Sequence, residues 1–146
     1  MTQFVFSDGG RRDAGFKSAK AGDCVARAVA IASGRPYAEV YERLSEGNRT
    51  QRGGRGKSGA KTASHGIYTQ RQWFKDYMRE LGFRWTATMG IGTGCRVHLR
   101  DDELPVGRLV VMLSKHATAV IDGVVFDTYD PARAGARCVY GYWRKA

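Results

Sequence analysis

The spacing of apolar residues changes near the middle of this chain, and that change constrains the fold more than any other feature. In three runs between Asp23 and Gly82, separated by glycines and prolines, apolar residues recur every three or four positions, as on one face of an α-helix. After Phe83 they fall in short β-branched and aromatic runs with period two, as in half-buried strands. Helices followed by strands favour an α+β fold, with helices packed on a mainly antiparallel sheet. The length, 146 residues with 42% hydrophobic, predicts a single domain over 1–146.

Glycines and prolines divide the first part of the chain. Residues 1–22 are polar and are expected to form an extended arm with no predicted element. The first helix should begin after Asp23, a good N-cap residue, and stop before Gly34. Pro36 suits the first position of a second helix, whose apolar face fades at Gly47.

A third helix and several strands follow. Thr69 and Gln72 have the spacing of a capping box, and the apolar stripe after them ends at Gly82. The pair Asp122-Gly123 is a strong signal for a two-residue hairpin turn. The predicted strands are 83–88, 108–113, 117–121, 124–129 and 139–143.

The chain is basic, and much of the positive charge lies in one segment. It has 24 Lys and Arg residues against 14 Asp and Glu residues, a net charge of +10. No acidic residue occurs between Glu46 and Asp76, and the glycine-rich span 47–66 is expected to be a mobile basic loop. Its cations, with Arg11 and Arg12 near, suit contact with the phosphates of nucleic acid or another polyanion. A solvated surface, a lid, or a docking segment for an acidic partner are the alternatives. The loop cations are Arg49, Arg52, Arg55, Lys57 and Lys61.

Apolar run lengths and cysteine count bear on cellular location. No stretch of 18 apolar residues occurs, so we expect no membrane span, and the N-terminus lacks the pattern of a secretory signal. The three cysteines, Cys24, Cys95 and Cys138, are an odd number without a CxxC pair. We therefore expect no disulfide framework, at least one free thiol, and a reducing cytoplasm.

Two weaker motifs carry no cofactor prediction. Cys95 and His98 have a spacing seen in zinc sites, but no pattern connects them to His65 or Cys138, so no metal site is expected. The segment 56–58, Gly-Lys-Ser, ends like a phosphate-binding loop but lacks the earlier glycine and the preceding strand. We expect no nucleotide or other cofactor.

Cys24 is the strongest candidate for chemistry in the first half. A cysteine directly after a helix cap lies near the positive end of the helix dipole and near unpaired N–H groups, which stabilise a thiolate. The alternative is a small buried hydrophobic residue at the start of a helix.

A histidine and an aspartate in the second half could serve such a thiolate. If Asp122-Gly123 is a two-residue turn, His116 and Asp127 lie on the same sheet face as diagonal neighbours, whereas Asp130 lies on the other face. A carboxylate on one imidazole nitrogen would leave the other nitrogen free to pair with a thiolate. The alternatives are a hydrogen-bonded histidine at a strand end and a solvated carboxylate.

These residues carry a family resemblance. The segment 22–24, Gly-Asp-Cys, opening a helix, followed by His116 at a strand start and an aspartate on the next strand, resembles the papain-like cysteine hydrolases. Within that superfamily the segments 23–28, 114–116, 127–130 and 140–143 are similar to proteins of tailed phages and prophages. The similarity extends over nearly the whole chain from Lys17.

The resemblance implies a papain-like fold and a hydrolase of an amide, isopeptide or related acyl bond in a peptide or protein. It implies that Cys24 is the nucleophile, His116 the base and Asp127 the orienting acid, with Asp130 as the alternative acid. It also implies the cytoplasm of a bacterial host. Papain-like enzymes commonly carry a glutamine six residues before the cysteine as an oxyanion donor. Here that position is Ser18, so Ser18 or Lys20 would have to act beside the Cys24 N–H. A catalytically inactive basic module that binds nucleic acid or an acidic host protein is the alternative function.

Overall fold

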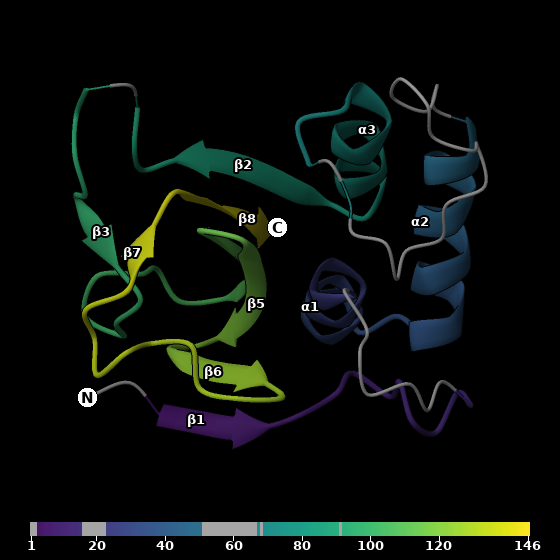
Figure 1. The fold of residues 1–146 in the computed structure, drawn as a ribbon, viewed down its shortest axis with the longest axis horizontal. Helices are drawn as coiled ribbons and strands as arrows, with labels where there is room; N and C mark the ends of the chain where they lie inside the picture. Colours follow the sequence, from purple (N-terminus) through teal and green to yellow (C-terminus); the bar gives the residue numbers. More distant parts are fainter. Residues whose placement is uncertain (1–2, 16–22, 51–66, 68, 91) are drawn as a thin grey trace.

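The computed structural model describes residues 3–15, 23–50, 67, 69–90 and 92–146, and Figure 1 shows helices on one side of a curved sheet. The helices are α1 (Cys24–Ser33), α2 (Tyr37–Thr50) and α3 (Gln72–Glu80). The strands are β1 (Gln3–Phe6), β2 (Phe83–Ala87), β3 (Val97–His98), β4 (Arg108–Leu113), β5 (His116–Ile121), β6 (Val124–Asp127), β7 (Cys138–Val139) and β8 (Gly141–Lys145).

The main sheet has the strand order β1-β6-β5-β4-β8-β2, and β3 pairs with β7 in a separate two-stranded sheet. Only the β1–β6 pair is parallel among these described strands. The predicted α+β class with a mainly antiparallel sheet is therefore confirmed. The strand β1 was not predicted, because its register, Gln3 opposite Val124 through Phe6 opposite Asp127, depends on a partner about 120 residues away in the sequence.

The predicted hairpin register is confirmed. Ile121 lies opposite Val124, and the two residues between them, Asp122 and Gly123, have φ angles of 49° and 81°. Positive φ at both central positions matches the twist of the flanking strands, which is why this dipeptide was a strong signal. Since the register alternates without a bulge, residues of β5 and β6 can be assigned to sheet faces directly from the pairing.

Each face of the sheet has its own hydrophobic cluster. On the helix side, Val29 of α1, Phe74 and Met78 of α3 and Trp143 of β8 are buried together. On the opposite side, Val111 and Val120 belong to a second cluster, to which the segment after β3, the segment before β7 and β7 itself contribute. The cluster also contains Leu99, Leu104, Leu109, Leu113, Val125, Ala132 and Val139. Both sheet faces are therefore buried, which explains the nearly continuous apolar run of β4.

The helix boundaries differ from prediction at two places. The capping box is wrong, because α3 begins at Gln72 with Arg71 as its N-cap residue, and Gln72 hydrogen-bonds Asp76 instead. Helix α2 does not fade at Gly47 but continues to Thr50. A Cβ at Gly47 would lie 2.3 Å from the Trp73 ring, so this glycine is there for close packing of α2 against α3 rather than to end the helix.

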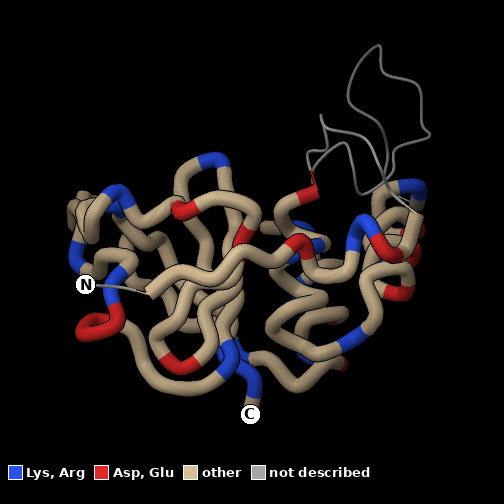
Figure 2. Tube along the Cα trace, turned by 90° about the horizontal axis from the view of Figure 1, so that it is seen from below, with Lys and Arg blue, Asp and Glu red and all other residues tan. Residues whose placement is uncertain are grey.

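Charge on the described surface is mixed. Figure 2 shows acidic and basic residues interspersed along the trace. Six of the 24 Lys and Arg residues, and none of the 14 Asp and Glu residues, fall outside the described part, which therefore carries +4. The span 47–66 was predicted as a mobile basic loop; its first four residues belong to α2, and 51–66 lie outside the described residues.

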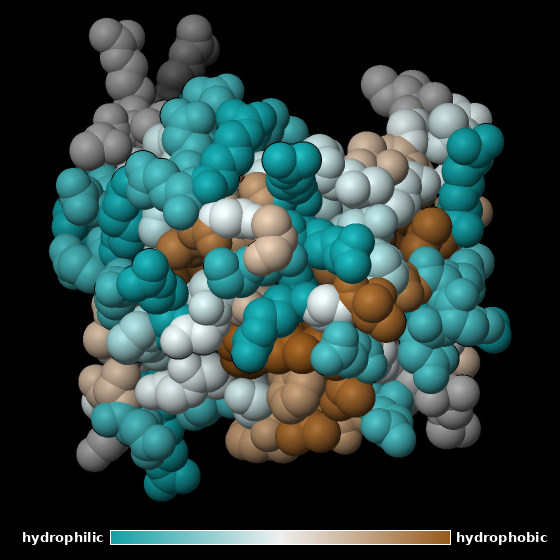
Figure 3. Space-filling model, turned by 180° about the vertical axis from the view of Figure 1, so that it is seen from behind, coloured by the Kyte–Doolittle hydropathy of each residue, from teal (hydrophilic) through white to brown (hydrophobic). Residues whose placement is uncertain are grey.

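Some apolar surface is exposed as well. Val5 and Phe6 of β1 are exposed, and Figure 3 shows apolar surface toward the lower edge of the molecule, the edge along which β1 runs in Figure 1. None of the helices in the described residues is long and apolar enough to cross a bilayer.

Candidate active site

Cys24 is the first residue of α1 and is partly buried. Its thiol hydrogen-bonds the His116 ring, and the backbone N–H of Ala117 also donates to the sulfur. Burial by itself raises the pKa of the Cys24 thiol, but these hydrogen bonds and the nearby charges of His116 and Arg27 outweigh burial and lower the pKa below its ordinary value. The surroundings of Cys24 therefore favour a thiolate.

His116 begins β5 directly after the two-residue turn of Ser114 and Lys115, where Lys115 has a φ of 58°. The buried Arg137 donates to the Ser114 carbonyl at 2.8 Å and so holds this turn. The Nε2 atom of His116 lies 2.7 Å from Oδ2 of Asp127, while the thiol of Cys24 is bonded to the same ring. Burial by itself lowers the pKa of His116, but its bonds to Asp127 and Cys24 raise the pKa to about 9.

Asp127 is the last residue of β6 and is buried. Its carboxylate also accepts a hydrogen bond from the Thr128 backbone N–H at 2.7 Å. Burial alone raises the pKa of Asp127, but hydrogen bonds, led by that of His116, lower it below the ordinary value. Asp130 does not contact the histidine: it is exposed, and its carboxylate accepts from the backbone N–H of Ala132 at 3.0 Å. Of the two predicted orienting acids, Asp127 is the one that hydrogen-bonds His116.

A second, buried group of polar residues lies beside Cys24. Asp23 is fully buried, and its carboxylate binds Arg27, Tyr37 and, at 2.8 Å, Arg11. Burial and the bond to Asp23 raise the pKa of Tyr37. Asp23 is the N-cap residue of α1, as predicted, but its side chain makes no cap hydrogen bond and binds these three partners instead.

Sequence reasoning missed Arg27 as a neighbour of the site and gave Tyr129 no role there. Arg27 bridges Asp23 and Asp127, and its separation of four residues from Asp23 on a predicted helix was a signal that could have identified the pair. The Tyr129 ring lies 5.1 Å from the His116 ring, centroid to centroid, and is half exposed. The two-residue turn at Asp122-Gly123 places Tyr129 opposite His116, so the register count was the sequence signal for this contact.

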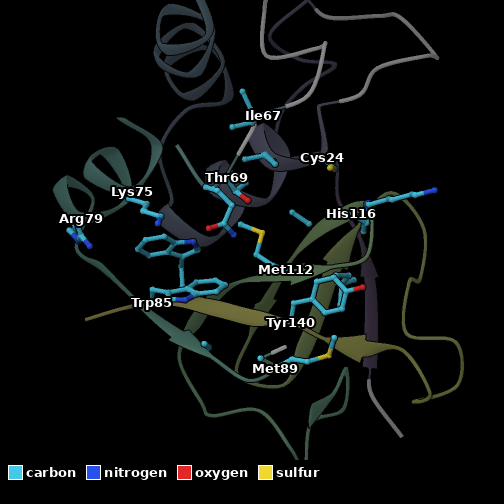
Figure 4. Close-up of a pocket in the computed structure, with 18 residues that line it drawn as sticks. Cys24, Ile67, Thr69, Lys75, Arg79, Trp85, Met89, Met112, His116 and Tyr140 are labelled. Atoms are coloured by element: carbon cyan, nitrogen blue, oxygen red, sulfur yellow. The ribbon is translucent and has the colours of Figure 1, made fainter. Parts of the chain in front are cut away.

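The site opens into a cleft of about 930 Å³ (Figure 4). Figure 4 shows Cys24 and His116 toward one end, Lys75 and Arg79 toward the other, and Met112 and Trp85 between them. The walls come from α1, α3, the ends of β4 and β5, the edge strand β2 and its neighbour β8. The lining of the cleft includes Trp85, Met112, Trp143, Lys75, Arg79 and Lys115.

The cysteines correct one expectation. Cys95 and Cys138 form a disulfide that links the segment before β3 to β7, and Cys24 is the free cysteine. The odd count correctly predicted a free thiol but wrongly excluded a bridge, because cysteines 43 residues apart meet only when β3 pairs with β7. The cysteine count therefore no longer argues for a reducing compartment.

The other candidate ligands are separated or lie outside the described part. His98 pairs with Glu103 at 3.2 Å, and no group of acidic, histidine or cysteine side chains among the described residues is arranged to hold a metal. Arg11, which was expected beside the basic loop, is paired with Asp23 instead. Arg49 pairs with Glu42 at 2.9 Å. The remaining predicted positions, Ser18, Lys20, Arg52, Arg55, Lys57, Lys61 and His65, lie outside the described residues.

We compared the chain with models of known protein families, with curated proteins and with solved structures. None of the three comparisons finds a match. The function therefore has to be argued from the site itself.

Proposed function

We propose that the protein is a cysteine hydrolase of papain-like type that acts on an amide, isopeptide or related acyl bond. One observation carries the proposal: the Cys24 thiol is bonded to His116, whose Nε2 is bonded to the buried Asp127, at the end of a cleft. A nucleophile, a base and an orienting acid in hydrogen-bond contact are the parts that acyl transfer to a thiol requires. A histidine that merely ends a strand does not need contact with both a buried carboxylate and a thiol.

In the proposed mechanism the Cys24 thiolate attacks the carbonyl carbon and forms a C–S bond. The carbonyl electron pair moves to oxygen, and that oxyanion accepts a hydrogen bond from the Cys24 N–H, which is unpaired within α1 because it belongs to the first turn. The oxyanion then collapses, the bond to the leaving group breaks, and the His116 imidazolium gives its proton to that group. A thioester remains on Cys24.

Hydrolysis of the thioester completes the cycle. Neutral His116 removes a proton from water, the hydroxide attacks the thioester carbonyl, and the C–S bond breaks to release a carboxylic acid and the thiolate. Asp127 holds the imidazole orientation and stabilises its protonated form in both halves of the cycle. The second oxyanion donor suggested by the resemblance, Ser18 or Lys20, stays part of the proposal.

The phage relationship and a location in the bacterial host cytoplasm also belong to this proposal, and both derive from the resemblance. The alternative, a binding module without turnover, draws on the net charge of +10 and on the cations at 52, 55, 57 and 61. Such a module would have no use for an ionised Cys24, so the state of this thiol distinguishes the two functions.

The test has two stages. First, the rate of Cys24 alkylation by iodoacetamide is followed by mass spectrometry between about pH 5 and pH 10 in the wild type and in His116→Gln. We expect a fast reaction well below pH 8 in the wild type. At pH 7 the variant should be at least about tenfold slower, because only the Ala117 N–H and the charge of Arg27 then oppose the effect of burial, which raises the thiol pKa.

Second, p-nitrophenyl acetate is supplied in excess. The wild type should form an acetyl thioester at Cys24 and release more than one equivalent of nitrophenol, while Cys24→Ala should do neither. A slow, histidine-independent thiol would refute the hydrolase. A single equivalent of nitrophenol with a stable thioester would favour the binding module.

A further inference from the structure

The Lys, Arg, Asp and Glu residues that line the cleft beside Cys24 are all basic among those described. Its lining includes three basic residues, Lys75, Arg79 and Lys115, and no Asp or Glu among the described residues that form it. Lys75 and Lys115 form no ion pair with a described residue, and Arg79 has only the exposed Asp76 at 3.6 Å. Charges of one sign on the wall of a concave site concentrate ligands of the opposite sign.

The cleft floor between Cys24 and two of these cations is aromatic and apolar. Trp85 of β2 lies in register with Trp143 of β8, with ring centroids 5.3 Å apart. Trp143 is buried, whereas Trp85 is 41% exposed and so presents an indole face to the cleft. Met112 lines the same floor. An exposed indole beside a thioether is a good surface for an aromatic or aliphatic side chain.

The order of these features along the cleft defines a ligand. Starting from the sulfur, Figure 4 shows the apolar floor first and the side chains of Lys75 and Arg79 beyond it. From this order we infer that the substrate is an acidic peptide segment, in which an apolar side chain lies next to the bond that is attacked and a carboxylate side chain follows. This inference rests on the proposed function and adds the substrate class to it. A peptide fits better than a nucleic acid because the proposed reaction needs an acyl bond.

The experiment uses reactive peptides that differ only in one side-chain charge. The first probe is chloroacetyl-Trp-Glu-amide, in which the peptide follows the reacting carbon. The second is acetyl-Glu-Trp chloromethyl ketone, in which the peptide precedes it. Each probe is also made with Gln or Lys in place of Glu. The readout is the second-order rate constant for modification of Cys24, measured by mass spectrometry on the whole protein.

We expect the Glu probe to react about five- to tenfold faster than the Lys probe in at least one orientation, with the Gln probe between them. The difference should shrink in about 0.5 M NaCl, because exposed charges are screened. In the double variant Lys75→Gln with Arg79→Gln, the ratio of the Glu-probe rate to the Lys-probe rate should fall to about twofold or less. Arg84→Gln is the control. It removes one positive charge from an exposed residue of β2 that is next to Trp85 but on the other face of the strand. This variant should leave the preference for the Glu probe unchanged.

The possible outcomes distinguish a failure of the acidic-substrate inference from a failure of the proposed hydrolase function. Equal rates for the three charges with a reactive Cys24 would overturn the acidic substrate and leave the hydrolase standing. An unreactive Cys24 would overturn the hydrolase itself. Protection of Cys24 from the Gln probe by a short single-stranded oligonucleotide, but not by the unreactive peptide acetyl-Glu-Trp-amide, would assign the cleft to nucleic acid and also overturn the inference.

Discussion

The Nη2 atom of Arg27 lies 3.8 Å from Oδ1 of Asp127, and the same guanidinium binds the buried carboxylate of Asp23. Arg27 therefore joins the N-terminal end of α1 to the strand that carries the partner of His116. Removing one member of a buried ionic group leaves the others without compensation, which is costly. Arg27 is thus expected to support the fold as well as the site.

We predict that Arg27→Gln lowers the free energy of unfolding by about 1–3 kcal/mol, less than a bare buried charge would cost because Asp23 keeps Arg11 and Tyr37. The matched control is Arg35→Gln, which removes an exposed pair with Glu39 on α2 and should cost at most about 1 kcal/mol. Urea denaturation measures both. Equal losses in the two variants would show that Arg27 has no special role.

The two aspartates near His116 give a paired prediction. Asp127→Asn should lower the His116 pKa below about 9 and slow Cys24 alkylation near neutral pH, because an amide stabilises the imidazolium less well than a carboxylate. Asp130→Asn should leave both unchanged and weaken only the turn to Ala132. NMR titration of the His116 ring protons measures the pKa. The reverse pattern would mean that the β5–β6 register is shifted.

The pH dependence of stability follows from the opposed shifts of Cys24 and His116. A histidine with a raised pKa stabilises the fold fully below its unfolded value of 6.5, and this contribution is lost as the pH rises through about 9. The lowered pKa of Cys24 acts oppositely, because the folded thiol loses its proton first. The two effects therefore oppose each other, and the free energy of unfolding of the wild type should fall less between pH 6.5 and 9 than the His116 shift alone would cause.

Cys24→Ala removes one of these opposed contributions. In that variant stability should fall as the pH rises above 6.5, by up to about 1.4 kcal/mol per pH unit until the remaining His116 pKa is passed. Adding His116→Gln to Cys24→Ala should remove this pH dependence of the free energy of unfolding. Chemical denaturation at several pH values measures the slope, and parallel profiles for the wild type and Cys24→Ala would contradict the thiolate–imidazolium pair.

The disulfide should be detectable without any assay of function. Under non-reducing conditions we expect a proteolytic digest to contain peptides linked through Cys95 and Cys138, with Cys24 alone accessible to alkylation. Cys95→Ser should lower the free energy of unfolding by about 2–4 kcal/mol in oxidising buffer and have little effect in reducing buffer. Alkylation of all three cysteines in the folded, unreduced protein would show that the bridge is absent.

Close packing at the cleft wall gives the last prediction. A Cβ at Gly141 would lie 2.4 Å from the Trp85 ring and 2.9 Å from the backbone oxygen of Thr86. Gly141→Ala should therefore cost about 1–3 kcal/mol and shift the fluorescence of Trp85. Gly90→Ala is the control, since its Cβ would meet only a methyl group of Thr93 at 3.6 Å. Equal stability in the two variants would mean that β2 and β8 pack less closely.

The amino-acid sequence alone was enough to predict the α+β class, the hairpin at Asp122-Gly123 and the shared face of His116 and Asp127. These depend on local signals: apolar periodicity, one turn dipeptide and the strict alternation of side chains along strands. The structure confirms the class and the register. Once the turn was known, counting residues was sufficient to choose Asp127 over Asp130 as the neighbour of His116.

Tertiary structure decided everything that joins distant segments. Three features require residues from different segments of the chain to meet: the parallel strand β1, the bridge between Cys95 and Cys138, and the contacts of Asp23 with Arg11 and Tyr37. The same holds for the cleft, whose walls come from α1, α3 and four strands. Local patterns indicate whether each segment favours a helix, a strand or a turn. Which segments become neighbours depends on burying both faces of one sheet at once. That burial is a property of the whole chain.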